Sequence, residues 1–167
     1  MSSLRIIVAA LTLAVVGPPA LAAPLDAAHY SGTWLEVGRT PMKLTDGCVA
    51  GTTTYTRTDA THVTVVDDCR KGGPDGPRKA VTGKGVIKDP GSDHILDVRY
   101  FLILNWRFEV LDHDPAGRWF IAGDLKRKAQ RIFIFTRSPP SQAELDDLVA
   151  KARATGYTGT IEMPRTR

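Results

Sequence analysis

Few residues of this chain have the types and spacing that catalysis requires. Ser92-Asp93-His94 contains the side chains of a nucleophilic relay, but neighbours in a turn or strand point in alternating directions and cannot form one. Asp112-His113-Asp114 could ligate a metal ion, yet no matching cluster of ligands occurs elsewhere in the sequence. Phosphate-binding loops, Gly-x-Ser-x-Gly elbows and dinucleotide fingerprints are missing too. We therefore predict no catalytic residue, no metal site and no cofactor.

The first 22 residues have the pattern of a secretory signal peptide. Arg5 precedes an apolar run from Ile6 to Val16, and Ala20-Leu21-Ala22 provides a small-x-small cleavage site. The run is about half as long as a membrane-spanning helix requires, so a retained anchor is the weaker alternative. Cleavage after Ala22 leaves residues 23–167 as one exported domain, either periplasmic or secreted.

Cleavage also sets the charge of the exported part. Arg5 is the only charged side chain among residues 1–22, so the net charge falls from +4 to +3 when they are removed. A basic excess this small in an exported protein argues against a nucleic-acid partner. It leaves room for weak attraction to an anionic membrane surface.

The two cysteines, Cys48 and Cys69, predict a disulfide, because export exposes them to an oxidising compartment. Residues 52–57 and 60–67 are rich in threonine and valine and read as strands, with Thr58-Asp59 as a two-residue turn between them. In such a hairpin Cys48 faces Cys69 directly, and opposed residues lie ~4.5–5.5 Å apart, within disulfide range. A reduced, metal-binding pair of thiols is the alternative.

The chain as a whole predicts an all-β fold. Strand-like segments recur at intervals of roughly 8–14 residues, and clusters of glycine, proline and aspartate separate them. The expected strands are 32–39, 49–57, 61–68, 79–88, 94–100, 106–112, 118–123 and 131–137. Eight antiparallel strands in up-and-down order can close into a β-barrel whose interior holds side chains or one small ligand. In this order the loops after the odd-numbered strands share one end, which we call the mouth.

One amphipathic helix is expected after the last strand. Ser141-Gln142-Ala143-Glu144 forms a capping box, in which the serine and the glutamate satisfy each other's free amides. An apolar stripe follows at helical spacing: Leu145, Leu148, Val149 and Ala152. Gly156 suits the end of the helix, and a single helix beside a closed barrel must pack outside it. Residues 157–161 could add a short final strand.

Four motifs in this order make the chain similar to the lipocalins. Gly32-Thr33-Trp34 resembles their Gly-x-Trp signature, and Gly123-Asp124 falls where bacterial lipocalins end the seventh strand. Arg137 sits where the family carries an arginine, and the helix after the last strand is the fourth match. The resemblance covers residues 30–161 and is nearest to the bacterial lipocalins related to apolipoprotein D. It implies a non-enzymatic carrier of a hydrophobic small molecule, namely a fatty acid or a lysophospholipid.

The resemblance also implies where the protein is located and which two residues close the base of the barrel. Membrane-anchored relatives have a lipoprotein cysteine that this chain lacks, which favours a soluble exported product, with outer-membrane association as the alternative. Trp34 and Arg137 match the family's pair at the closed base of the barrel, where the guanidinium stacks on the indole. We expect this pair to hold the barrel shut and to contribute ~2 kcal/mol or more.

The alternation of strand residues predicts which side chains face the interior. An apolar inner wall with one or two polar groups is typical of a small-molecule site. The predicted ligand-binding residues are Glu36, Tyr55, Val98, Tyr100, Trp106, Phe108 and Phe133. The alternative is that these side chains simply fill the barrel, which would make the protein an interaction module that displays its loops.

The mouth loops suggest a second surface. Leu102 and Leu104 lie in one predicted loop, and Lys126, Arg127 and Lys128 lie in another. An apolar tip ringed by cations is typical of a surface that touches anionic membranes, although ordinary solvated turns are the alternative. A lipocalin-fold enzyme acting on a lipid-like substrate is a further alternative, for which Glu36 is the one acid–base candidate.

Overall fold

The computed structural model describes residues 23–102 and 104–166, so the predicted signal peptide lies outside the described residues. The strands are β1 (Ser31–Arg39), β2 (Cys48–Arg57), β3 (His62–Lys71), β4 (Arg78–Ile87), β5 (Ile95–Tyr100), β6 (Leu104–His113), β7 (Trp119–Asp124) and β8 (Arg131–Thr136), and they are followed by the helix α1 (Gln142–Ala154). In the described part of the chain, no helix is both long enough and apolar enough to cross a membrane.

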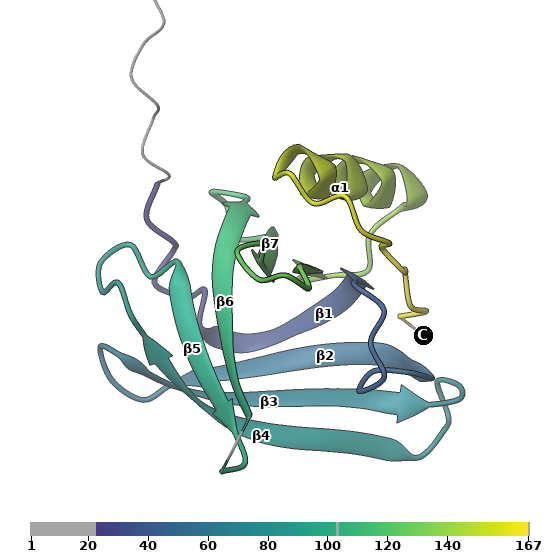
Figure 1. Cartoon of the computed structure of the whole chain (residues 1–167), viewed down its shortest axis with the longest axis horizontal. Helices are drawn as coiled ribbons and strands as arrows, with labels where there is room; N and C mark the ends of the chain where they lie inside the picture. The colour runs from purple at the N-terminus through teal and green to yellow at the C-terminus, as the bar shows by residue number, and fades with distance from the viewer. Residues whose placement is uncertain (1–22, 103, 167) are drawn as a thin grey trace, which may run out of the picture.

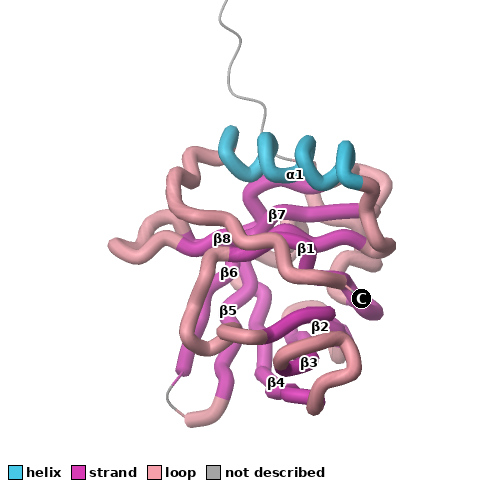
Figure 2. Tube along the Cα trace, turned by 90° about the vertical axis from the view of Figure 1, so that its right-hand side faces the viewer, coloured by secondary structure: helices cyan, strands magenta, loops and turns pink. Residues whose placement is uncertain are grey.

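The eight strands form a closed antiparallel barrel. Each strand pairs with its neighbours in the chain, and β1 also pairs with β8 to close the ring. Figure 1 shows β2, β3 and β4 running side by side along one wall, and Figure 2 shows α1 lying across β7 and β8 outside the barrel. The predicted up-and-down barrel with one external helix is confirmed.

The helix begins and packs as its sequence predicts. Ser141 and Glu144 form the expected capping box, and the buried helix residues are Leu148 and Ala152. They pack against the outward face of β8, where Ile132 and Ile134 are both fully buried. This second core lies outside the barrel and fixes the helix without using the barrel interior.

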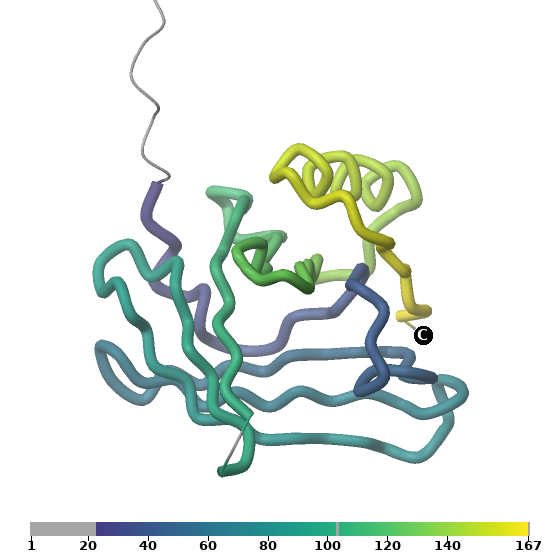
Figure 3. Tube along the Cα trace, in the orientation of Figure 1, coloured from purple at the N-terminus to yellow at the C-terminus, as the bar shows by residue number. Residues whose placement is uncertain are grey.

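The segment after the helix does not form the expected final strand. Residues 157–161 have no strand assignment, and an isolated bridge joins the next residue, Glu162, to Arg39. The tail continues past the loop after β1, and the amide of Ala50 donates a hydrogen bond to the carbonyl oxygen of Arg165 at 2.6 Å. Figure 3 shows this tail beside the β1–β2 loop.

The predicted two-residue turn between β2 and β3 is wrong. Thr58 to Thr61 form a longer connection, because the Asp59 carboxylate accepts hydrogen bonds from the amides of Thr61 (2.8 Å) and His62 (2.9 Å). The register therefore differs, and Cys48 stands opposite Lys71. The disulfide with Cys69 is nevertheless present, since the two Cα atoms are 5.5 Å apart across the diagonal.

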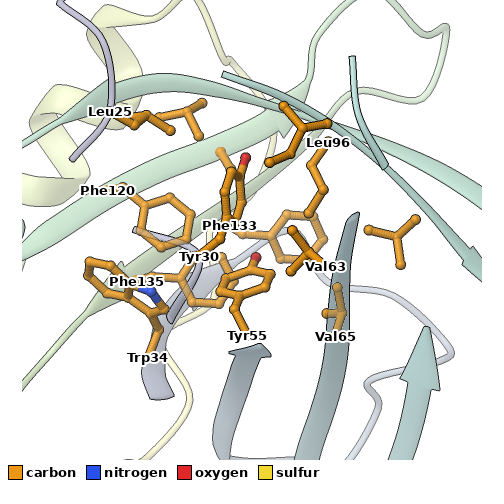
Figure 4. Close-up of a cluster of buried hydrophobic side chains, with 14 of the residues drawn as sticks. Leu25, Tyr30, Trp34, Tyr55, Val63, Val65, Leu96, Phe120, Phe133 and Phe135 are labelled. Atoms are coloured by element: carbon orange, nitrogen blue, oxygen red, sulfur yellow. The ribbon is translucent and has the colours of Figure 1, made fainter. Parts of the chain in front are cut away.

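Aromatic side chains fill the base of the barrel, the end opposite the mouth. Trp34 packs edge-on against Phe120 (ring centroids 4.7 Å apart), and Phe120 stacks on Phe135 at the same distance. His29, from the segment before β1, packs on Phe120 with centroids 4.5 Å apart. Figure 4 shows the rings of Trp34, Phe120 and Phe135 near one another, with Tyr30 beside them. A more polar pocket of about 280 Å³ lies beside them and is lined by Leu25, His29, Trp34 and Arg137, among others.

The buried His29 makes stability depend on pH. Burial, reinforced by the charge of Arg137, lowers the pKa of His29 from 6.5 to about 3. Between those pH values the unfolded chain binds a proton that the folded chain does not, so acid favours unfolding by up to roughly 1.4 kcal/mol per pH unit. This contribution is absent above the pKa of the unfolded state.

We predict that His29→Phe flattens the pH dependence of stability. The phenyl ring keeps the aromatic packing but cannot take up a proton, so the variant should lose less stability than the native protein between about pH 6.5 and pH 4. Denaturant unfolding at several pH values measures this difference. The two proteins are compared first at pH 7.5, where only packing distinguishes them. Parallel curves at lower pH would contradict the prediction.

Candidate functional site

A cavity of about 220 Å³ lies in the mouth half of the barrel, above the aromatic base. All the residues predicted to bind a ligand line it: Glu36, Tyr55, Val98, Tyr100, Trp106, Phe108 and Phe133. The alternation of strand residues therefore placed these side chains on the correct face. The volume is somewhat below the ≈ 300–1,000 Å³ typical of drug-sized pockets, so the space suits a narrow molecule.

One wall of the cavity is a continuous row of aromatic rings. Successive ring centroids lie 6.1 Å apart from Tyr100 to Trp106, 5.9 Å from Trp106 to Phe108 and 5.6 Å from Phe108 to Phe133. Inward positions on β5, β6 and β8 supply these rings, because residues two apart on a strand share one face. The row offers an apolar surface that runs from the mouth toward the base.

The base pair predicted from the sequence is in contact. The guanidinium carbon of Arg137 lies 3.6 Å from the centre of the Trp34 ring, and Trp34 is only 1% exposed. Arg137 also donates hydrogen bonds to the carbonyl oxygens of Thr33 (3.1 Å) and Ala28 (3.0 Å). The Trp34 indole donates one to the carbonyl oxygen of His29 at 3.0 Å. Together these contacts tie the segment before β1 to the end of β8 and close the base.

Arg39, which no sequence pattern singles out, is 3% exposed and holds several segments together. Its guanidinium bonds Glu36 at 2.6 Å, Glu162 at 2.5 Å and the carbonyl oxygen of Cys48 at 2.9 Å. Burial raises the pKa of Glu36, although Arg39 opposes that change. The charge of Arg39 is thus met within the protein, and Glu36 is held against the cavity wall as one half of an ion pair.

Asp67 is a cavity residue that sequence analysis also missed. Its carboxylate accepts hydrogen bonds from the Thr53 hydroxyl at 2.7 Å and the Tyr100 hydroxyl at 2.5 Å. Burial raises its pKa, and these two hydrogen bonds oppose the rise. Gly83 makes room for the Tyr100 ring, since a Cβ there would lie 2.8 Å from it. Asp67 is two residues from the inward-facing Val65 on the same strand, so the alternation of side chains along the strand could have placed it inside the barrel.

The apolar mouth residues separate into two groups. Phe101 and Leu102, which follow β5, are 73% and 94% exposed. Leu104 instead begins β6 and packs against the barrel core, where it lines the cavity. Phe101 also has a positive φ of 55°, a conformation that is costly for a large side chain.

The predicted mouth cations all lie at the surface, but two of them are paired. Lys126 contacts Glu109 at 3.2 Å, and Arg127 contacts Asp124 at 2.8 Å. Lys128 is exposed in the same loop. The positive charge that this loop offers to a partner is therefore smaller than a count of its basic residues implies.

The tripeptides considered for catalysis hold turns in place. The Ser92 hydroxyl donates a hydrogen bond to Asp89 at 2.7 Å, and Asp93 forms an ion pair with Arg57 at 2.6 Å. His94 and His113 lie near each other, with ring centroids 5.7 Å apart. Within residues 23–102 and 104–166, no group of three histidine, cysteine or acidic residues could hold a metal ion.

Comparisons with known proteins agree with this architecture. A family model described as "Lipocalin-like domain" matches residues 25–165. Lobster apocrustacyanin A1 is similar in structure, with 16% identity, a TM-score of 0.64, and 84% of this chain and 79% of that chain covered. Insecticyanin from the tobacco hornworm Manduca sexta gives 13% identity, a TM-score of 0.61, and coverages of 89% and 86%.

A third similar structure was solved with a bound molecule. Japanin from Rhipicephalus appendiculatus, bound to cholesterol, gives 15% identity and a TM-score of 0.58, and the alignment covers 86% of this chain and 98% of that chain. At these identities the likenesses establish the fold alone. No curated protein matches the sequence.

We predict that Arg137→Ala lowers the free energy of unfolding by about 2 kcal/mol, because the stack on Trp34 and two hydrogen bonds are lost. Affinity for a ligand in the mouth half should change little. Arg107→Ala is the matched control, since Arg107 pairs with Asp97 at the surface and should cost less than about 1 kcal/mol. Denaturant unfolding of both variants tests this, and equal losses would contradict it.

Proposed function

This chain belongs to the lipocalin-like domain family, and we propose that it is a non-enzymatic carrier that binds one hydrophobic small molecule in the cavity of its barrel. The observation that carries the proposal is the apolar space of about 220 Å³ between the aromatic wall and the filled base. We propose a single-chain lipid, a fatty acid or a lysophospholipid, because the space is narrow. Kinship with the bacterial lipocalins related to apolipoprotein D is part of the same proposal.

The route of the protein is likewise a proposal. Residues 1–22 have the pattern of a signal peptide, and cleavage would release residues 23–167 to the periplasm or the medium. The Cys48–Cys69 disulfide supports an oxidising compartment. A lipid carrier is useful there, because its ligand is poorly soluble in the aqueous space between membranes.

Burial of an acyl chain supplies the binding energy. Each methylene removed from water contributes ~0.8 kcal/mol, so ten methylenes contribute ~8 kcal/mol before costs are subtracted. Ordering the chain and losing its free translation consume part of that sum. Dissociation constants on the order of micromolar are the expected result.

Two features favour binding over the alternatives. A cavity is left in the barrel, whereas an interaction module with a filled barrel would leave none. Glu36, the acid–base candidate, forms an ion pair with Arg39 at 2.6 Å, which holds it in a structural contact. Proteins of similar structure also bind ligands, since the Japanin structure is described as bound to cholesterol and the siderocalin Ex-FABP as functioning through dual ligand specificities.

We also propose that the mouth touches anionic membranes when ligand is transferred. Phe101 and Leu102 are the most exposed large apolar side chains in the described part of the chain, and Phe101 also lines the cavity. The exposed Lys128 belongs to the same end of the barrel. An apolar tip next to the ligand entrance would enter the headgroup region while nearby cations attract the surface.

Filling the cavity should abolish ligand binding. We predict that Val81→Trp weakens binding of tetradecanoic acid and of its lysophosphatidylcholine by at least about tenfold, because the indole would occupy space that the acyl chain needs. Displacement of a bound fluorescent fatty acid measures the affinity. Val66→Trp is the control, since Val66 is on the neighbouring strand but does not line the cavity. Equal affinities for both variants would contradict an internal site.

Removing the apolar tip should weaken membrane contact. We predict that the double change Phe101→Ser and Leu102→Ser lowers binding to vesicles of phosphatidylglycerol by about tenfold, because two large side chains no longer enter the interface. Met163→Ser is the control, as Met163 is 49% exposed but lies in the C-terminal tail. Vesicle co-sedimentation measures the difference, and unchanged binding of the double variant would contradict the docking proposal.

A further inference from the structure

The cavity contains a carboxylate with no cation beside it. Asp67 lines the cavity, and none of the ion pairs among the described residues includes it: the neighbouring Asp68 pairs with Arg78 instead. A carboxylate removed from bulk water is costly unless hydrogen-bond donors or cations compensate it. In this cavity only Thr53 and Tyr100 donate to it.

Asp67 can accept more hydrogen bonds than it receives. An ionised carboxylate has about four acceptor positions, and the described residues fill two of them, one on each oxygen. The exposed part of the Asp67 side chain faces the cavity, because the residue is on the inward face of β3 with Val65. Its remaining acceptor capacity is therefore directed at whatever enters the cavity.

The other charged groups in the cavity wall do not offset Asp67. Arg39 is bound to Glu36, Glu162 and backbone carbonyl oxygens, so its charge and donors are already used. Lys79 lines the cavity at the mouth, where its ammonium group donates to the carbonyl oxygen of Leu44 at 2.6 Å. Neither of these cations forms an ion pair with Asp67.

A second polar group faces the same space. Tyr55 is 7% exposed and lines the cavity on β2, two residues from Thr53. Among the described residues its hydroxyl makes no hydrogen bond, although its ring packs against Tyr30 with centroids 5.3 Å apart. A hydroxyl in the ligand can donate to Asp67 and accept from such a phenol, because it has both a proton and lone pairs.

We infer that the cavity selects single-chain amphiphiles whose polar group is a hydroxyl that donates a hydrogen bond, and that Asp67 is the residue that recognises it. The inference rests on the proposed function and narrows the ligand class. A ligand carboxylate placed at Asp67 would meet a like charge in a poorly solvated space and would lose affinity. A fatty acid would therefore have to leave its carboxylate at the mouth.

Three probes with the same chain length test this selectivity: 1-tetradecanol, methyl tetradecanoate and tetradecanoic acid. Each is titrated against the disulfide-intact protein at pH 7.5 by displacement of a bound fluorophore. The expected result is that the alcohol binds about tenfold more tightly than the ester, which lacks a donor, and than the acid, which is anionic. An acid or an ester that binds as tightly as the alcohol would overturn the inference.

The variant Asp67→Asn tests whether Asp67 causes the preference for the alcohol over the acid. The change keeps the size of the side chain and removes its charge, so the preference for the alcohol over the acid should fall to about twofold or less. Asp97→Asn is the matched control, because it removes the same charge from a surface ion pair with Arg107 that does not line the cavity, and it should leave that ratio unchanged. A ratio that stays at its native value in Asp67→Asn would exclude Asp67 as the recognising residue. If none of the three probes binds the native protein, the proposed function fails.

Discussion

The stack of Arg137 on Trp34 is the contact that holds the first and last strands of the barrel together at its base. It joins the start of β1 to the end of β8, the two strands whose pairing closes the barrel. Trp34 packs on Phe120, which in turn stacks on Phe135, so aromatic rings pack the interior next to the base. The apolar cavity of about 220 Å³ lies in the mouth half. A second, more polar pocket of about 280 Å³ lies at the base, beside His29, Trp34 and Arg137.

Local sequence signals predicted the fold because they agree with one another. Strand-like segments gave the positions of the strands, and the alternation of side chains along each strand placed Phe108, Phe133 and Glu36 on the inward face. The capping box at Ser141 gave the start of α1. The register of β2 on β3 was not predictable from spacing, because the side chain of Asp59 lengthens the turn. The size of the cavity was not predictable either, since it is the volume that remains after distant rings have packed.

Two buried polar groups show why the functional site was harder to predict than the fold. Arg39 at the end of β1 reads as an ordinary surface arginine until the tail brings Glu162 beside it. The position of Asp67 along β3 corresponds to the inward face, but an aspartate is seldom expected in an apolar wall. Their roles differ. Arg39 has its partners within the protein and stabilises the mouth, whereas Asp67 retains acceptor capacity toward the cavity.

The central claim is that a ligand enters the mouth half of the barrel. Methyl-resolved NMR of the protein during titration with a single-chain lipid tests this most directly. We expect one-to-one saturation, with shifts of the methyl groups that line the cavity, Val65, Val81 and Val98. The signals of the methyl groups of Val66 on β3 and of Val149 on α1, which do not line the cavity, should not shift. Saturation that shifts the signals of Val66 and Val149 while the cavity signals remain unchanged would contradict the claim.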